Sequence, residues 1–137
     1  MSSEPSSQLI AIVDDDPSVL SALRDLIESE GLFTLCFRSA EEFMDSGVQQ
    51  NAGCLIADIR MPGMSGIELQ ARLKADRCRI PIIFITAHGD ASMRIQAMRE
   101  GAVEFLTKPF DNAVLLETVR AAVEDYSRTM GPGKSSQ

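Results

Sequence analysis

The sequence predicts an α/β fold in which a five-stranded parallel sheet is covered by helices on both faces. Two observations predict it. From Leu9 to about Arg128, short apolar runs alternate with amphipathic segments, and three of these runs contain no polar residue, as in strands that are buried on both faces. The chain has 137 residues, 45% of them apolar, which suits one domain with a substantial core. Together they indicate strand–helix units joined by right-handed crossovers.

The first two strands are expected near the start of the chain. Leu9–Val13 is a continuous apolar run, typical of a buried strand. Asp16 and Pro17 follow as an N-cap and a proline in the first helical turn, and apolar residues at helical spacing continue to a stop at Gly31. Phe33–Phe37 alternates apolar with less apolar residues, which indicates a strand with one less buried side.

The middle of the chain repeats the pattern. Ser39 and Glu42 form the sequence of a capping box, which predicts a short helix through Met44. Cys54–Ala57 is the third expected strand, and Met61–Gly66 is a loop rich in glycine and proline.

The last elements complete the alternation. They are a helix from about Gly66 to Ala75, a strand at Ile82–Ile85, a helix from about Ala91 to Glu100, a strand at Val103–Leu106 and a helix from about Asn112. The strand at Val103–Leu106 is interrupted by Glu104, so it and the second strand are the expected edges of the sheet. With the first, third and fourth strands central, the order is 2-1-3-4-5, that of a flavodoxin-like, doubly wound fold.

These elements are expected to form one domain, residues 9–128, preceded by a disordered segment at 1–8 and followed by a tail or the start of a linker at 129–137. The first residues lack the basic and apolar regions of a signal peptide, and no apolar run reaches the ~20 residues that span a bilayer. We therefore expect a cytoplasmic protein without a membrane contact.

Charge and cysteine content exclude several classes. The net charge of −7 argues against direct binding of nucleic acid, because such a surface repels phosphates. The three cysteines, Cys36, Cys54 and Cys78, are an odd number without metal-type spacing, which argues against a disulfide framework or a zinc site.

Polar residues stand where the predicted strands end. Asp14 and Asp15 follow the first strand, Asp58 the third, Thr86 the fourth, and Lys108 lies just beyond the fifth. Ligands of doubly wound sheets bind beyond these carboxyl ends. Neighbouring carboxylates repel one another unless a cation or proton intervenes, and their oxygens suit Mg²⁺.

Such a site can stabilise a transferring phosphoryl group while one carboxylate attacks its phosphorus. No glycine-rich phosphate loop is present, so the phosphoryl group is expected from a donor other than bound nucleotide. Simpler explanations exist for each residue: Asp14 and Asp15 could only cap a helix, Thr86 could be an ordinary strand-end hydroxyl, and Lys108 could be a solvated surface lysine.

Four segments, IVDDDPSV, LIADIRMPGMSGIEL, PIIFITAHGD and GAVEFLTKPF, resemble the signature segments of bacterial response-regulator receiver domains, in the same order and spacing. The resemblance covers roughly Leu9 to Val123 and is greatest to the FixJ-like subfamily. It implies that Asp58 accepts a phosphoryl group from a sensor histidine kinase, and that Thr86 and Lys108 contact the phosphoryl oxygens.

The resemblance further implies a metal site and a particular backbone. Asp14, Asp15 and Asp58 would hold Mg²⁺, helped by the backbone carbonyl of Arg60. The peptide bond between Lys108 and Pro109 is expected to be cis.

It also implies a switch. Thr86 and Phe105 would move together on phosphorylation, although Phe105 lacks a hydroxyl and could simply be core. His88 and Arg60 would tune the access of water. Residues 90–107 would form a phosphorylation-dependent homodimer, and transcription would be the output, through a DNA-binding domain absent from this chain.

Three alternatives stay open. A stand-alone receiver would act through protein contacts or a phosphorelay. A Mg²⁺-dependent phosphatase would hydrolyse many substrate molecules per chain. A receiver takes up about one phosphoryl group per chain, so it is not an enzyme that turns over a substrate. A flavodoxin-like cofactor carrier would be distinguished by the colour of its bound cofactor.

Overall fold

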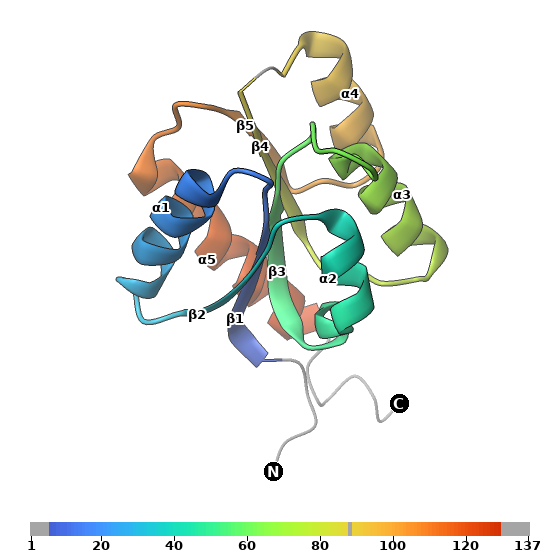
Figure 1. The fold of residues 1–137 in the computed structure, drawn as a ribbon. Helices are drawn as coiled ribbons and strands as arrows, with labels where there is room; N and C mark the ends of the chain where they lie inside the picture. Colours follow the sequence, from blue (N-terminus) through green and yellow to red (C-terminus); the bar gives the residue numbers. More distant parts are fainter. Residues whose placement is uncertain (1–5, 88, 130–137) are drawn as a thin grey trace.

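Five strands form one parallel sheet in the order β2-β1-β3-β4-β5 (Figure 1). The structure is a computed structural model that describes residues 6–87 and 89–129. The strands are β1 (Ser6–Val13), β2 (Phe33–Phe37), β3 (Ala52–Ala57), β4 (Ile82–Thr86) and β5 (Glu104–Thr107). The predicted order is confirmed, including the placement of the polar-interrupted strands β2 and β5 at the edges.

Helices cover both faces of the sheet, as predicted. They are α1 (Pro17–Glu28), α2 (Ala40–Ser46), the 3-10 helix η1 (Val48–Gln50), α3 (Gly66–Ala75), α4 (Ala91–Arg99) and α5 (Asn112–Thr129). Helices α1 and α5 lie on one face, and α2, α3 and α4 lie on the other (Figure 1). The sequence did not predict η1.

Alternation along the central strands builds two cores. In β1, Ile10 and Ile12 point toward α1 and α5, whereas Ala11 and Val13 point toward the other three helices. Both sets are almost completely buried, so a shift of one residue along β1 would exchange the two faces. The register of the sheet, and with it the position of the strand ends, is therefore strongly fixed.

Helix caps follow the sequence closely. The side chain of Asp16 accepts a hydrogen bond from Ser18 N, with Pro17 as the first helical residue, as predicted. Ser39 caps α2 by accepting from Glu42 N, but the Glu42 carboxylate accepts from Arg38 N and not from Ser39 N, so the predicted capping box is only half formed.

Several elements extend beyond their predicted bounds. Strand β1 begins at Ser6, three residues before the expected start, because Ser6 pairs with Ala52 at the start of β3. Residues 6–8, assigned from the sequence to an N-terminal segment, thus belong to the strand. Strand β5 is shifted by one residue and includes Thr107. Residues 1–5 and 130–137 lie outside the described part of the chain, and no described helix is long and apolar enough to cross a membrane.

Candidate functional site

The predicted site residues lie at the carboxyl end of the sheet, held by its hydrogen bonds. Asp58 follows β3, and its backbone N donates to Val13 O in β1 at 3.1 Å. Lys108 follows β5, and its backbone N donates to Thr86 O in β4 at 2.8 Å. Each position continues the ladder of the sheet by one residue, so the strands themselves position the site.

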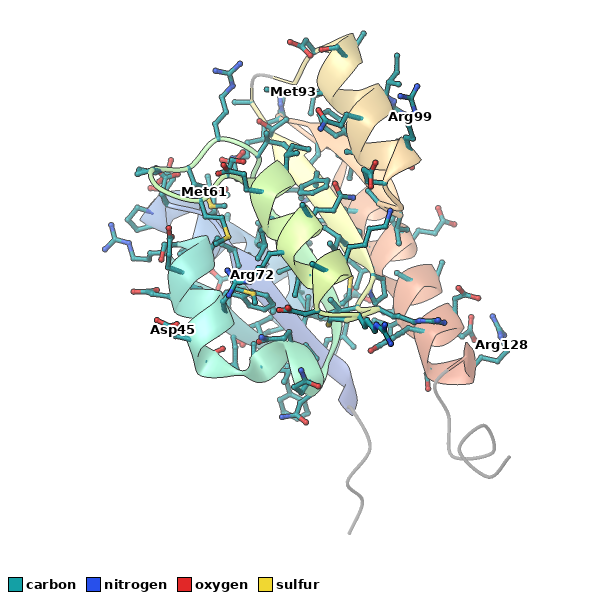
Figure 2. The ribbon with its side chains drawn as sticks, turned by 90° about the vertical axis from the view of Figure 1, so that its right-hand side faces the viewer. Asp45, Met61, Arg72, Met93, Arg99 and Arg128 are labelled. Atoms are coloured by element: carbon teal, nitrogen blue, oxygen red, sulfur yellow. The ribbon has the colours of Figure 1, made fainter. Side chains whose placement is uncertain are left out.

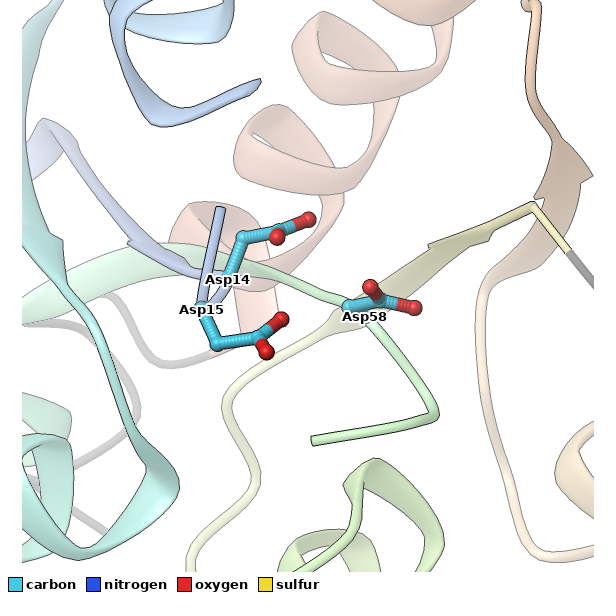
Figure 3. A group of neighbouring side chains, drawn as sticks. All are labelled: Asp14, Asp15 and Asp58. Atoms are coloured by element: carbon cyan, nitrogen blue, oxygen red, sulfur yellow. The ribbon is translucent and has the colours of Figure 1, made fainter. Parts of the chain in front are cut away.

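Three carboxylates surround one small space beyond these strands. Asp14, Asp15 and Asp58 each offer an oxygen, and these oxygens all lie within 4.8 Å of one another (Figure 3). Asp14 is 2% exposed and Asp58 9% exposed, whereas Asp15 is open to solvent. The cluster predicted from the ends of the first and third strands is confirmed as a geometric group.

Backbone donors and one lysine orient the two buried carboxylates. Asp14 Oδ1 accepts from Asp16 N at 2.9 Å, and Asp58 Oδ1 accepts from Ile59 N at 2.7 Å. The second oxygen of each is directed toward Lys108: its Nζ lies 3.1 Å from Asp14 Oδ2 and 3.5 Å from Asp58 Oδ2. The lysine is therefore part of the site and not a solvated surface residue.

The pKa directions indicate an excess of negative charge. Burial raises the pKa of the Asp14 carboxyl; the Asp16 amide and Lys108 oppose this rise, and Asp58 adds to it. Burial disfavours the Lys108 ammonium, but the carboxylates of Asp14 and Asp58 outweigh it and raise the pKa of this lysine above its ordinary value. One ammonium does not neutralise three acids, so the site favours a further cation.

The donor set fits Mg²⁺. Hard oxygen ligands from one or two carboxylates, completed by water, are what this ion takes in proteins. Asp15 is exposed enough to leave room for water beside the two buried acids. Arg60 lies two residues beyond Asp58, with its side chain exposed. The part played by its backbone carbonyl stays a prediction.

Thr86 and Phe105 lie side by side beneath the loop that follows β4. Both are almost fully buried, and the ring of Phe105 is tilted against that of Phe84 with 6.4 Å between centroids. A Cβ at Gly89 would lie 2.5 Å from the Phe105 ring and 2.8 Å from the Thr86 methyl. The Phe105 ring is thus already buried against Gly89. Any movement that couples Phe105 to Thr86 would begin from this buried position. His88 lies outside the described residues.

Sequence reasoning missed the part played by Gly66. A Cβ at this position would lie 2.3 Å from the backbone oxygen of Asp58, so only glycine fits there. The available signal was a glycine as the first residue of a helix, where it is a poor helix former. Ser65 and Glu68 also form a full capping box, which was not predicted. The expected cis bond between Lys108 and Pro109 is confirmed.

Comparisons with known proteins agree with this geometry. Residues 10–120 match the family described as the response regulator receiver domain. The chain is 48% identical over 118 residues to the response regulator protein TodT of Pseudomonas putida, covering 86% of this chain and 52% of TodT. It is 42% identical over 119 residues to the transcriptional regulatory protein FixJ of Azorhizobium caulinodans, covering 87% of this chain and 56% of FixJ.

The solved structures agree as well. The beryllofluoride-activated NtrC4 receiver domain dimer superposes with a TM-score of 0.81 at 29% identity, covering 88% of this chain and 99% of that one. The chain spans about half the length of the curated relatives named above.

Proposed function

The chain belongs to the family of response regulator receiver domains, and from this premise we propose that it is a phosphorylation-operated switch whose phosphoacceptor is Asp58. The observation that supports the choice of Asp58 is its position at the end of a central strand. There its carboxylate meets those of Asp14 and Asp15 within 4.8 Å and the ammonium of Lys108 at 3.5 Å.

The proposed donor is a phosphohistidine of a sensor histidine kinase. A carboxylate oxygen of Asp58 attacks the phosphorus, the bond between phosphorus and the imidazole nitrogen breaks, and that nitrogen keeps the electron pair and takes a proton. Lys108 offers its positive charge to the phosphoryl oxygens, and the Thr86 hydroxyl is the proposed hydrogen-bond donor to one of them.

Mg²⁺ is the proposed cofactor, and it would supply charge neutralisation beside the phosphoryl group. Asp14, Asp15 and Asp58, with the carbonyl of Arg60, are the residues proposed to hold it. Because the acids, the lysine and the hydroxyl act on the chain's own aspartate, the protein would catalyse its own phosphorylation and slow dephosphorylation only. Arg60 and His88 are proposed to tune the access of water.

Labelling by a small phosphodonor tests this assignment. Acetyl phosphate with Mg²⁺ should label the wild type to about one phosphoryl group per chain, and Asp58→Asn should abolish the label. Asp45→Asn, which removes an exposed acid from α2, is the matched control and should label normally. Chelation of the metal should stop labelling. Undiminished label in Asp58→Asn, label mapped to Asp14, or continuous turnover of donor without a stable limit would contradict the proposal.

Residues 90–107 are the proposed surface for a phosphorylation-dependent homodimer. Three large apolar side chains, Ile95, Met98 and Val103, are exposed on α4 and the adjoining turn. Arg94 joins α4 to β5, since its guanidinium donates to Phe105 O at 3.0 Å and lies 3.8 Å from a Glu104 oxygen. The similarity to the activated NtrC4 dimer supports pairing of this kind. Sedimentation with beryllofluoride should show a dimer, and an unchanged monomer at tens of micromolar would contradict it.

The output of the whole protein is also a proposal. By analogy with FixJ, whose name describes a transcriptional regulatory protein, we propose control of transcription through a DNA-binding domain outside residues 1–137, in a cytoplasmic protein. A stand-alone receiver acting through protein contacts is the other reading. The reading frame beyond Gln137 distinguishes them, because only the first requires a DNA-binding domain encoded in it.

A further inference from the structure

Helix α2 contacts the loop that follows the phosphoacceptor strand. Glu41, in the first turn of α2, accepts a hydrogen bond through Oε2 from the backbone N of Met64 at 2.9 Å, across 23 residues of sequence. Figure 2 shows this loop, with Met61 labelled, passing over the start of α2. The contact joins a helix outside the site to the segment that also carries Arg60.

The fit at this contact is close. Gly63 has a φ of 78°, in the left-handed region that favours glycine. A Cβ there would lie 2.6 Å from Glu41 Oε2. The carboxylate thus lies directly against the Cα of Gly63 while it accepts the N–H of the next residue.

The same loop is fixed at its base. Gly66 N donates to Ile59 O at 2.8 Å, and the Gly66 Cα lies against the backbone oxygen of Asp58. Residues 60–65 therefore form a closed loop, held at its base by Ile59 and Asp58, directly after β3, and at its far side by Glu41. A substitution at Glu41 removes only the hydrogen bond at the far side of the loop. It therefore alters the loop but leaves Asp14, Asp15 and Asp58 in place.

We propose that Glu41 is a positioning residue that sets the geometry of this loop and thereby the preference of the acidic site for Mg²⁺ over Ca²⁺. The inference rests on the proposed function, in which the Arg60 carbonyl is one of the metal ligands. Mg²⁺ requires near-octahedral ligands at about 2.0–2.1 Å, whereas Ca²⁺ accepts about 2.3–2.6 Å and variable geometry. Loss of one well-placed oxygen therefore weakens Mg²⁺ binding more than Ca²⁺ binding.

Metal titrations of the 137-residue chain, followed by NMR amide shifts, test the role of Glu41. Glu41→Ala should raise the dissociation constant for Mg²⁺ roughly tenfold, at the lower limit for loss of a group that orients metal ligands. The constant for Ca²⁺ should change less than about twofold, since its geometry is more tolerant. Without metal, the Met64 amide should exchange with solvent faster in Glu41→Ala than in the wild type.

Two matched variants separate the effect of the hydrogen bond between Glu41 and the loop from the effect of the negative charge. Glu41→Gln removes the charge but keeps an oxygen acceptor for Met64 N, and it should retain most of the Mg²⁺ preference. Glu42→Ala removes the same charge from the same turn, but its carboxylate accepts from Arg38 N and not from the loop, so Mg²⁺ binding should be unaffected. Thermal melts should show that all variants are folded.

The outcomes that overturn the inference are specific. Unchanged Mg²⁺ binding in Glu41→Ala, equal weakening of both cations, or the same loss in Glu42→Ala would each exclude a positioning role for Glu41. A wild-type chain that binds no Mg²⁺ would overturn the metal site of the proposed function itself, and with it this inference.

Discussion

The ammonium of Lys108 lies 3.1 Å from a carboxylate oxygen of Asp14, a residue 94 positions earlier in the chain. The same ammonium is 3.5 Å from Asp58. Lys108 is thus already paired with two carboxylates before any phosphoryl group is attached. In the proposed mechanism, an incoming phosphoryl group has to compete with Asp14 for this lysine, unless a bound cation takes over the charge of the acids.

Removal of Lys108 should make the stability of the fold depend on bound metal. In Lys108→Ala, Asp14 and Asp58 lose their internal counter-ion, and we expect the free energy of unfolding without Mg²⁺ to fall by about 1–3 kcal/mol. Added Mg²⁺ should then raise the melting temperature more than it does in the wild type, because the cation restores the missing positive charge. Thermal melts in chelator and in Mg²⁺ measure both effects.

The control for that experiment is Lys74→Ala. Lys74 pairs with Glu100 at 2.8 Å on the exposed surface, away from the acids. The response of this variant to Mg²⁺ should equal that of the wild type. A Lys108→Ala variant that also responds like the wild type would show that the lysine does not neutralise the site.

Gly66→Ala should damage both fold and site. The added Cβ would lie 2.3 Å from Asp58 O, and backbone cannot yield as a flexible side chain can. We expect a loss of about 2–3 kcal/mol of stability in urea unfolding, together with slower phosphoryl uptake. Gly31→Ala is the comparison, because Gly31 has a φ of 84° but open space around it. In that variant the backbone strain of a positive φ acts without a steric clash, and it should cost about 1 kcal/mol of stability. Equal losses in the two variants would contradict the steric argument.

Ile95→Glu should prevent the proposed dimer without preventing phosphorylation. Ile95 is 55% exposed on α4, and a carboxylate at the centre of an apolar contact is costly to desolvate. Sedimentation with beryllofluoride should show only monomer for this variant. Leu35→Glu, on the edge strand β2 at the other side of the sheet, should dimerise normally. Dimers of Ile95→Glu, or their loss in Leu35→Glu, would place the interface elsewhere.

The cysteines should report on opening of the core. Cys54 is buried, and burial raises its pKa to about 12, whereas Cys36 and Cys78 are only half-buried. At pH 8, native protein should be alkylated at Cys36 and Cys78, with Cys54 protected until the chain unfolds. Mass spectrometry after timed alkylation measures each site. Modification of Cys54 at the rate of Cys36 would indicate that the central strand β3 is accessible in the native state.

The strand order was predictable because the central strands are apolar and the edges are not. The uninterrupted apolar runs form the central strands β1, β3 and β4. Glu104 correctly predicted that β5 is an edge strand. Strand starts were less predictable. Ser6 and Ala52 begin strands through pairing with each other, and neither residue type has a strong preference for strands.

The site was predictable only in part. The three acids could be located from the ends of neighbouring strands, because parallel strands bring those ends together. The position of Lys108 depends on its pairing with Thr86 and on the side-chain path toward Asp14, so the residues alone also suited a surface lysine. The contact between Glu41 and Met64 lies between a helix and a loop and has no periodic signal at all.

The spread of the site along the chain also has a consequence during protein synthesis. The three acids leave the ribosome before Lys108 does, and α5, which packs against β1 and β3, is the last of the described elements to emerge. Until residue 108 has emerged and β5 has paired with β4, a nascent chain presents carboxylates without their lysine. Under the function proposed above, the complete acceptor site therefore forms only after residue 108 has emerged and β5 has paired with β4.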